Sequence, residues 1–101
     1  MNEFEITLTQ AQNMTSAYQN DETFDGLTKA VYIDKDSLMD LLDQENATGV
    51  RFYFAIDSNE ALNVVAVGTK EDGDVDLTGG VLLGNLKRCP LQCDINSALL
   101  T

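Results

Sequence analysis

Two apolar segments joined by a short polar turn constrain the fold of this chain most strongly. Positions 50–56 alternate in two sets, as a strand with two different faces requires: Val50, Phe52, Phe54 and Ile56 on one face, and Arg51, Tyr53 and Ala55 on the other. Residues 57–60, Asp-Ser-Asn-Glu, are typical of a hairpin loop. The return segment, residues 61–69, is apolar on both faces, so we predict that it is a central strand.

Helices and shorter strands are predicted on either side of this hairpin. Apolar residues at helical spacing and a capping box at Thr7 predict a helix over residues 5–19. Residues 29–33 predict a short strand, and Asp34 caps a second predicted helix that is rich in leucine. The connection over residues 33–48 is long enough for a right-handed crossover between parallel strands. After the turn at Asp72 and Gly73, we predict a third antiparallel strand over residues 75–77.

These elements predict an α+β fold, in which a small mixed β-sheet of three to four strands carries two helices packed on one face. A length of 101 residues fits a single domain, 1–101, whose core can form without disulfides or metals. No segment has the apolar length of a membrane span, and the acidic N-terminus does not resemble a signal peptide. We therefore expect a cytoplasmic protein.

Composition restricts the partners and the chemistry of this chain. Asp and Glu number 17 against 6 Lys and Arg, and the net charge of −11 repels nucleic acids and anionic membranes but attracts a basic partner. Histidine is absent, which excludes Ser-His-Asp and Cys-His nucleophiles and histidine-ligated zinc within the chain. Phosphate-binding loops and other catalytic motifs are also missing from the sequence. We expect no enzymatic activity.

Polar residues in the strand and in the following turn are the first candidate binding residues. Arg51 and Tyr53 on one face would suit an anion, although such an arginine more often pairs with a carboxylate at the margin of a sheet. Asp72, Asp74 and Asp76 alternate like the start of a calcium-binding loop. The glycine and glutamate that such a loop needs at its sixth and twelfth positions are missing, which favours a hairpin turn with outward carboxylates.

Both cysteines of the chain lie in residues 87–93, Lys-Arg-Cys-Pro-Leu-Gln-Cys. Three residues separate Cys89 from Cys93, unlike the C-x-x-C spacing of redox motifs. Small structural residues are the interpretation we favour. A disulfide, a zinc ion shared by the cysteines of a dimer, and redox catalysis stay open as alternatives. Pro90 also suits the first position of a final helix.

Three motifs of the chain resemble those of a group of small uncharacterised bacterial proteins, whose function is unknown. The motifs are a G-[IV]-R-x-Y-[FY] strand, a V-G-x4-G-x-D-L segment and a C-terminal C-P-P-x-C sequence. The matching positions are Gly49, Val50, Arg51, Tyr53, Phe54, Gly68, Asp76, Leu77, Cys89, Pro90 and Cys93, with Leu91 in place of the second proline. The resemblance implies no activity, but it strengthens Arg51, Tyr53 and the cysteine pair as candidate site residues. Asp76, one of the matching positions, is a further candidate binding residue.

Two functions from different classes follow. The first is a non-enzymatic protein-interaction module, for example an inhibitor or immunity-type partner of a basic protein. The alternative is a thiol-redox or metal-binding protein that uses Cys89 and Cys93. No cofactor is expected apart from the shared zinc of this alternative, and the oligomeric state is not predicted.

Overall fold

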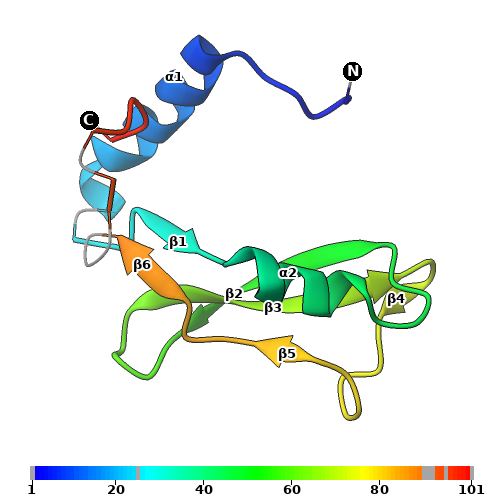
Figure 1. Ribbon diagram of the computed structural model, residues 1–101. Coiled ribbons are helices and arrows are strands. Elements are labelled where there is room, and N and C mark those ends of the chain that lie inside the picture. The colour runs from blue at the N-terminus through cyan, green and yellow to red at the C-terminus, as the bar shows by residue number, and fades with distance from the viewer. Residues whose placement is uncertain (1, 25, 90–92, 95, 101) are drawn as a thin grey trace. The chain divides into compact units, whose positions relative to one another are not determined.

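A computed structural model of the chain describes residues 2–24, 26–89, 93–94 and 96–100 and has a small α+β fold (Figure 1), so the predicted fold class is confirmed. In chain order the elements are α1 (Leu8–Gln19), the 3-10 helix η1 (Glu22–Phe24), β1 (Ala30–Tyr32), α2 (Lys35–Leu42), β2 (Gly49–Ile56), β3 (Leu62–Lys70), β4 (Gly73–Asp74), β5 (Leu82–Leu83) and β6 (Lys87–Cys89). The chain divides into two compact units, one formed by Met1–Leu27 with Cys93–Thr101 and the other by Thr28–Gln92. The organisation as a single domain stays a prediction.

The first unit is built around α1, which begins at the predicted capping box. The Thr7 hydroxyl accepts a hydrogen bond from the Gln10 backbone at 3.1 Å, and the Gln10 side chain accepts one from the Thr7 backbone at 2.9 Å. After the helix ends, the ring of Phe24 stacks on Tyr18 with 4.9 Å between centroids. Such an aromatic pair contributes about 0.5–1.5 kcal/mol beyond the area it buries. The predicted helix over residues 5–19 is thus confirmed from Leu8 onward.

Turns occupy the described C-terminal part of this unit, for which the sequence left a final helix as a possibility. The described residues 93–94 and 96–100 contain no helix, while Pro90, Leu91 and Ile95 lie outside the described residues. The Gln19 side chain donates a hydrogen bond to the Leu99 carbonyl at 2.9 Å, which holds this segment to α1. The final helix that the sequence left open is thus not formed by residues 93–94 and 96–100.

The second unit is built on the predicted hairpin of β2 and β3. These strands pair antiparallel from Gly49 with Thr69 to Ile56 with Leu62, and β3 is central because β4 and β5 pair with its other edge. The Asp57 carboxylate accepts the backbone N–H groups of the loop residues Asn59 and Ala61, which closes the turn. Both the hairpin and the central position of β3 are confirmed.

Helix α2 packs on one face of this sheet, as Figure 1 shows. It begins at Asp34, whose carboxylate accepts the Ser37 backbone N–H at 3.2 Å. The absence of a side chain at Gly68 lets the helix approach β3, since a Cβ atom there would lie 3.0 Å from the Leu41 carbonyl oxygen. The side chain of Leu41 is fully buried. The other buried apolar residues in the described part of the chain are Val64, Ala66, Val67, Val75 and Cys89.

The predicted parallel crossover is wrong. Strand β1 pairs antiparallel with β6 in a separate two-stranded sheet, in which Ala30 lies opposite Cys89 and Tyr32 opposite Lys87. Strand β1 instead takes the late strand β6 as its partner, and β2 forms a hairpin with the neighbouring segment β3. The third antiparallel strand is also displaced, because β4 covers Gly73–Asp74 instead of residues 75–77. In the described part of the chain, no helix combines the length and apolar character that crossing a membrane requires.

Candidate functional site

Arg51 and Tyr53 are drawn together by a carboxylate from another strand of the same sheet. Arg51 Nη1 lies 2.5 Å from Asp74 Oδ1, and the Tyr53 hydroxyl donates a hydrogen bond to Asp74 Oδ2. Hydrogen bonding to Tyr53 and the charge of Asp74 raise the pKa of Arg51. Both side chains extend across β3 to β4, so the anion that Arg51 binds is the Asp74 carboxylate of the same chain. Arg51 is thus paired with a carboxylate at the margin of the sheet, which is the more common arrangement for an arginine in a strand.

Asp76 shapes its own turn and does not join this pair. Its carboxylate accepts hydrogen bonds from the Thr78 hydroxyl at 2.7 Å and the Thr78 backbone at 3.0 Å, and its carbonyl accepts the Gly80 N–H. The hydrogen bonds from Thr78, the one from its hydroxyl first, lower the pKa of Asp76. The structure therefore brings Arg51 and Tyr53 together and places Asp76 in a separate turn. A binding role for any of them stays a prediction.

Two open hollows adjoin Lys70. One is lined by residues 46–48 and 70–72, and the other lies between the end of α2 and the turn that contains Asp76. The Lys70 ammonium is 4.0 Å from the Asp72 carboxylate, at a position where both side chains are largely exposed.

Both cysteines are disulfide-bonded, which differs from the unlinked residues that the sequence favoured. Because the chain contains only two cysteines, the bond joins Cys89 to Cys93. Cys89 is buried at the end of β6, and the intervening residues 90–92 lie outside the described part of the chain. While the bond is intact, neither sulfur is a thiolate that binds a metal or attacks a substrate. Within the described residues, no group of three or more Cys, Asp and Glu side chains is arranged to hold a metal ion.

A buried polar cluster of Asp57, Asn63 and Arg88 lies at the hairpin loop and was not predicted from the sequence. Asp57 Oδ2 accepts a hydrogen bond from Asn63 Nδ2 at 2.9 Å and lies 3.3 Å from Arg88 Nε, while Asn63 Nδ2 also donates to the Leu86 carbonyl at 2.8 Å. The cluster joins the hairpin to β6 and satisfies its own polar groups, which indicates a structural role. Asn63, a polar residue in an otherwise apolar segment, was the available signal.

One face of β2 exposes large apolar side chains, and we call Phe52, Phe54 and Ile56 the β2 face. Their exposed fractions are 47%, 84% and 70%, respectively. They lie on the side of the sheet that faces α2 at Gly68, and all three side chains remain exposed. Among the described residues, β2 pairs only with β3 and so has an open edge. An exposed apolar strand at a sheet edge is a surface to which another chain can bind.

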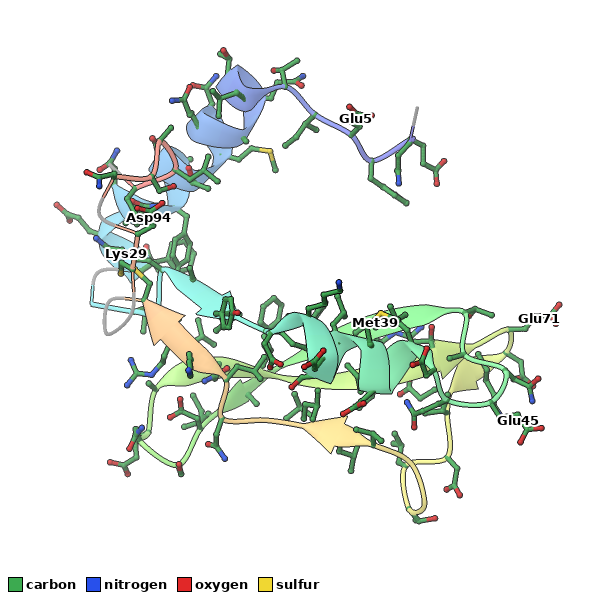
Figure 2. The ribbon with its side chains drawn as sticks, viewed as in Figure 1. Glu5, Lys29, Met39, Glu45, Glu71 and Asp94 are labelled. Atoms are coloured by element: carbon green, nitrogen blue, oxygen red, sulfur yellow. The ribbon has the colours of Figure 1, made fainter. Side chains whose placement is uncertain are left out.

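Acidic side chains flank the β2 face at both ends of the strand. Glu45, Glu71 and Asp72 are exposed near the Gly49 end, where Gly49 lies opposite Thr69, and Glu60 is exposed in the hairpin loop after Ile56. Figure 2 shows Glu45 and Glu71 extending outward at the same end of the sheet. Between these acids, β2 itself carries only the positive charge of Arg51. An apolar strip with acidic ends is therefore the most distinctive surface of this unit.

Comparison with known proteins gives no family for the chain. No protein-family model, no curated protein and no solved structure matches it. The function has to be inferred from the chemistry of the described residues, among which the β2 face is the surface best suited to recognition.

Proposed function

We propose that this chain is a small non-enzymatic protein-interaction module that binds a basic protein. The β2 face is the observation that carries the proposal, because Phe54 is 84% exposed at the open edge of a sheet. An aromatic side chain in water contributes binding free energy once a partner covers it, and aromatic residues are enriched in the centres of protein interfaces.

The net charge supports a basic partner. A charge of −11 on a chain of 101 residues produces a negative potential that speeds encounter with a positively charged surface. The same potential opposes nucleic acids and anionic membranes as partners. An inhibitor or immunity-type role fits these properties, since such a protein needs only to cover a basic effector. Catalytic groups are not required for it.

The thiol-redox and zinc-binding alternative has less support. Zinc binding depends on free sulfurs, so the disulfide between Cys89 and Cys93 would have to be reduced first. A redox role would cycle this bond between disulfide and dithiol, but the C-x3-C spacing differs from that of redox motifs. Zinc shared across a dimer and redox activity stay predictions. A cytoplasmic location stays a prediction too, and the disulfide favours an oxidising compartment instead.

The proposal is tested by binding to a purified basic partner. The oxidised chain is immobilised, proteins from its source cells are applied at low ionic strength, and a basic protein recovered from them is purified and titrated by calorimetry. We expect a stoichiometric complex whose affinity falls as sodium chloride is raised. An unrelated acidic protein of similar size and charge is the control for simple ion exchange. A basic protein that binds the control equally well, or no stoichiometric complex at all, would falsify the proposal.

A further inference from the structure

We propose that the basic partner binds by adding an extended segment to the open edge of β2, with alternate apolar residues over the β2 face and basic residues at the acidic ends. This inference rests on the proposed function and specifies its binding mode. The added segment would become a further strand of the sheet, next to β2.

The backbone of β2 provides the template for such a strand. Gly49–Ile56 is eight residues long and is paired with β3 along its whole length, from Gly49 opposite Thr69 to Ile56 opposite Leu62. Full pairing on one side fixes the strand in an extended conformation before any partner arrives. The backbone N–H and C=O groups along the other edge then point away from the sheet and can pair with an incoming strand.

The side chains of β2 specify what that strand contains. Phe52, Phe54 and Ile56 recur at every second position on one face, so a strand paired with them covers them with its own alternate residues. Apolar side chains at those positions bury the most surface. On the opposite face, Arg51 and Tyr53 are both engaged with Asp74 and do not select the partner by charge.

Charge distribution specifies the ends of the strand. Near Gly49, the acids Glu45, Glu71 and Asp72 are offset only by Lys70, which lies beside Asp72. Near Ile56, Asp57 is paired with Arg88, and Glu60 remains exposed. The stronger negative charge is therefore at the Gly49 end. A lysine or arginine of the bound segment lies at this end of the sheet in this arrangement, where Glu45 and Glu71 extend outward (Figure 2).

The same acids argue against a second copy of this chain as the occupant. Antiparallel pairing of two β2 edges would place Glu60 of one copy near Glu45 and Glu71 of the other. Parallel pairing would place each group of acids beside its equivalent. Charges at the ends of an edge strand oppose self-association in either orientation, and the net charge of −11 on each copy adds to the repulsion.

A synthetic peptide tests this binding mode directly. The probe is as long as β2, alternates valine with threonine and carries lysines at both ends. Two controls are a peptide of the same composition in scrambled order and a peptide with glutamates in place of the lysines. Binding to the full oxidised chain is measured by fluorescence anisotropy. We expect only the alternating basic peptide to bind, with changes in backbone amide chemical shifts that are concentrated in β2.

Matched variants distinguish binding at the β2 face from nonspecific binding elsewhere on the chain. Phe54→Ser should weaken probe binding at least about tenfold, since burying a phenylalanine contributes about 1.5–3 kcal/mol. Phe4→Ser removes the same side chain from a position that is 80% exposed and should leave the affinity unchanged. Glu45→Lys with Glu71→Lys should also weaken binding, whereas Glu3→Lys with Glu5→Lys changes the net charge equally and should have a much smaller effect.

Several outcomes would overturn this binding mode. They are equal binding of the scrambled peptide, equal losses in both phenylalanine variants, or a dimer of the chain that sedimentation detects and Phe54→Ser disrupts. If a purified basic partner binds the chain and the Phe54→Ser variant with equal affinity, the strand-addition mode fails and the proposed function stands. If the probe binds β2 but no basic protein forms a salt-sensitive complex, the proposed function fails instead.

Discussion

At the tip of the β2–β3 hairpin, the Asp57 carboxylate is held by the Asn63 side chain and by backbone N–H groups of the loop, and it lies beside Arg88. The hydrogen bond from Asn63, followed by the one from the Ala61 backbone, lowers the pKa of Asp57. A carboxylate with a lowered pKa stabilises the folded state only while it is ionised. The hairpin is therefore expected to be sensitive to acid at this residue.

We expect Asp57→Asn to lower the free energy of unfolding at neutral pH. The contribution of ionised Asp57 is fully present above its unfolded pKa, about 3.9, and is lost as the pH falls through the lower folded value. The deficit of the variant should therefore shrink in acid. Urea unfolding at neutral and acidic pH measures it, with Asp72→Asn in an exposed turn as the control. A deficit that is equal at both pH values would show that the charge of Asp57 is unimportant.

At the scale of elements, the packing of α2 depends on a glycine in the central strand. A Cβ atom at Gly68 would lie 2.7 Å from Gln44 Nε2 and 3.0 Å from the Leu41 carbonyl oxygen. Gln44 in turn accepts the Val81 backbone N–H and donates to the Leu41 carbonyl, so it joins α2 to the segment before β5. A side chain at Gly68 would disturb both contacts.

We predict that Gly68→Ala destabilises the second unit by about 1–3 kcal/mol, the usual cost of overpacking a filled core. Gly84→Ala is the matched control, because a Cβ atom there would meet only Val65 Cγ2 at 4.0 Å. The control should be neutral or stabilise by up to about 1 kcal/mol. Denaturant unfolding of both variants gives the comparison, and equal stabilities would mean that α2 shifts at no cost.

Local pattern was sufficient to predict the elements whose contacts are close in sequence. Alternation over residues 50–56, a polar loop and an apolar return segment specify the β2–β3 hairpin, and Asp34 marks the start of α2. The pairing of β1 with β6 was missed because Lys87-Arg88-Cys89 is short and polar, with no strand pattern. Residues 87–89 form a strand because the tertiary structure brings them beside β1, and strand propensity does not predict such a pairing.

The candidate site was predicted only in part for the same reason. Pairing of Arg51 with a carboxylate was considered from the sequence, but β3 lies between Arg51 and Asp74, so the identity of that carboxylate depends on strand order. Grouping Phe52, Phe54 and Ile56 on one face was possible from alternation alone. Their exposure was not, because an apolar face is normally buried. The predicted crossover from residues 29–33 offered residues 50–56 a second, parallel neighbour, so nothing in the sequence indicated that β2 is an edge strand.

At the scale of the whole molecule, the excess of acidic residues has an energetic cost. Seventeen Asp and Glu residues against six Lys and Arg repel one another more strongly in the compact state than in the expanded unfolded chain. Among the described residues, the ion pairs of Arg51 with Asp74, Lys70 with Asp72 and Arg88 with Asp57 involve three of these acids. Dissolved salt should screen the remaining repulsion.

We expect the unfolding temperature to rise when sodium chloride is increased from low to physiological concentration, because the Debye length shortens to about 8 Å. Thermal denaturation followed by circular dichroism measures the change. Sodium sulfate at equal ionic strength separates screening from salt-specific effects on apolar surface. A melting temperature that stays constant or falls with sodium chloride would contradict this view of the charge.

The pairing of β1 with β6 also determines when folding can finish during synthesis. The β2–β3 hairpin joins neighbouring segments and can form as soon as Lys70 has left the ribosome. Tyr32, in contrast, pairs with Lys87, which is synthesised much later. Strand β1 therefore has no partner until most of the chain has been made. Contacts between residues distant in sequence form slowly because a long loop must close first. A nascent chain that ends before β6 therefore leaves β1 unpaired, and the small sheet assembles only near release.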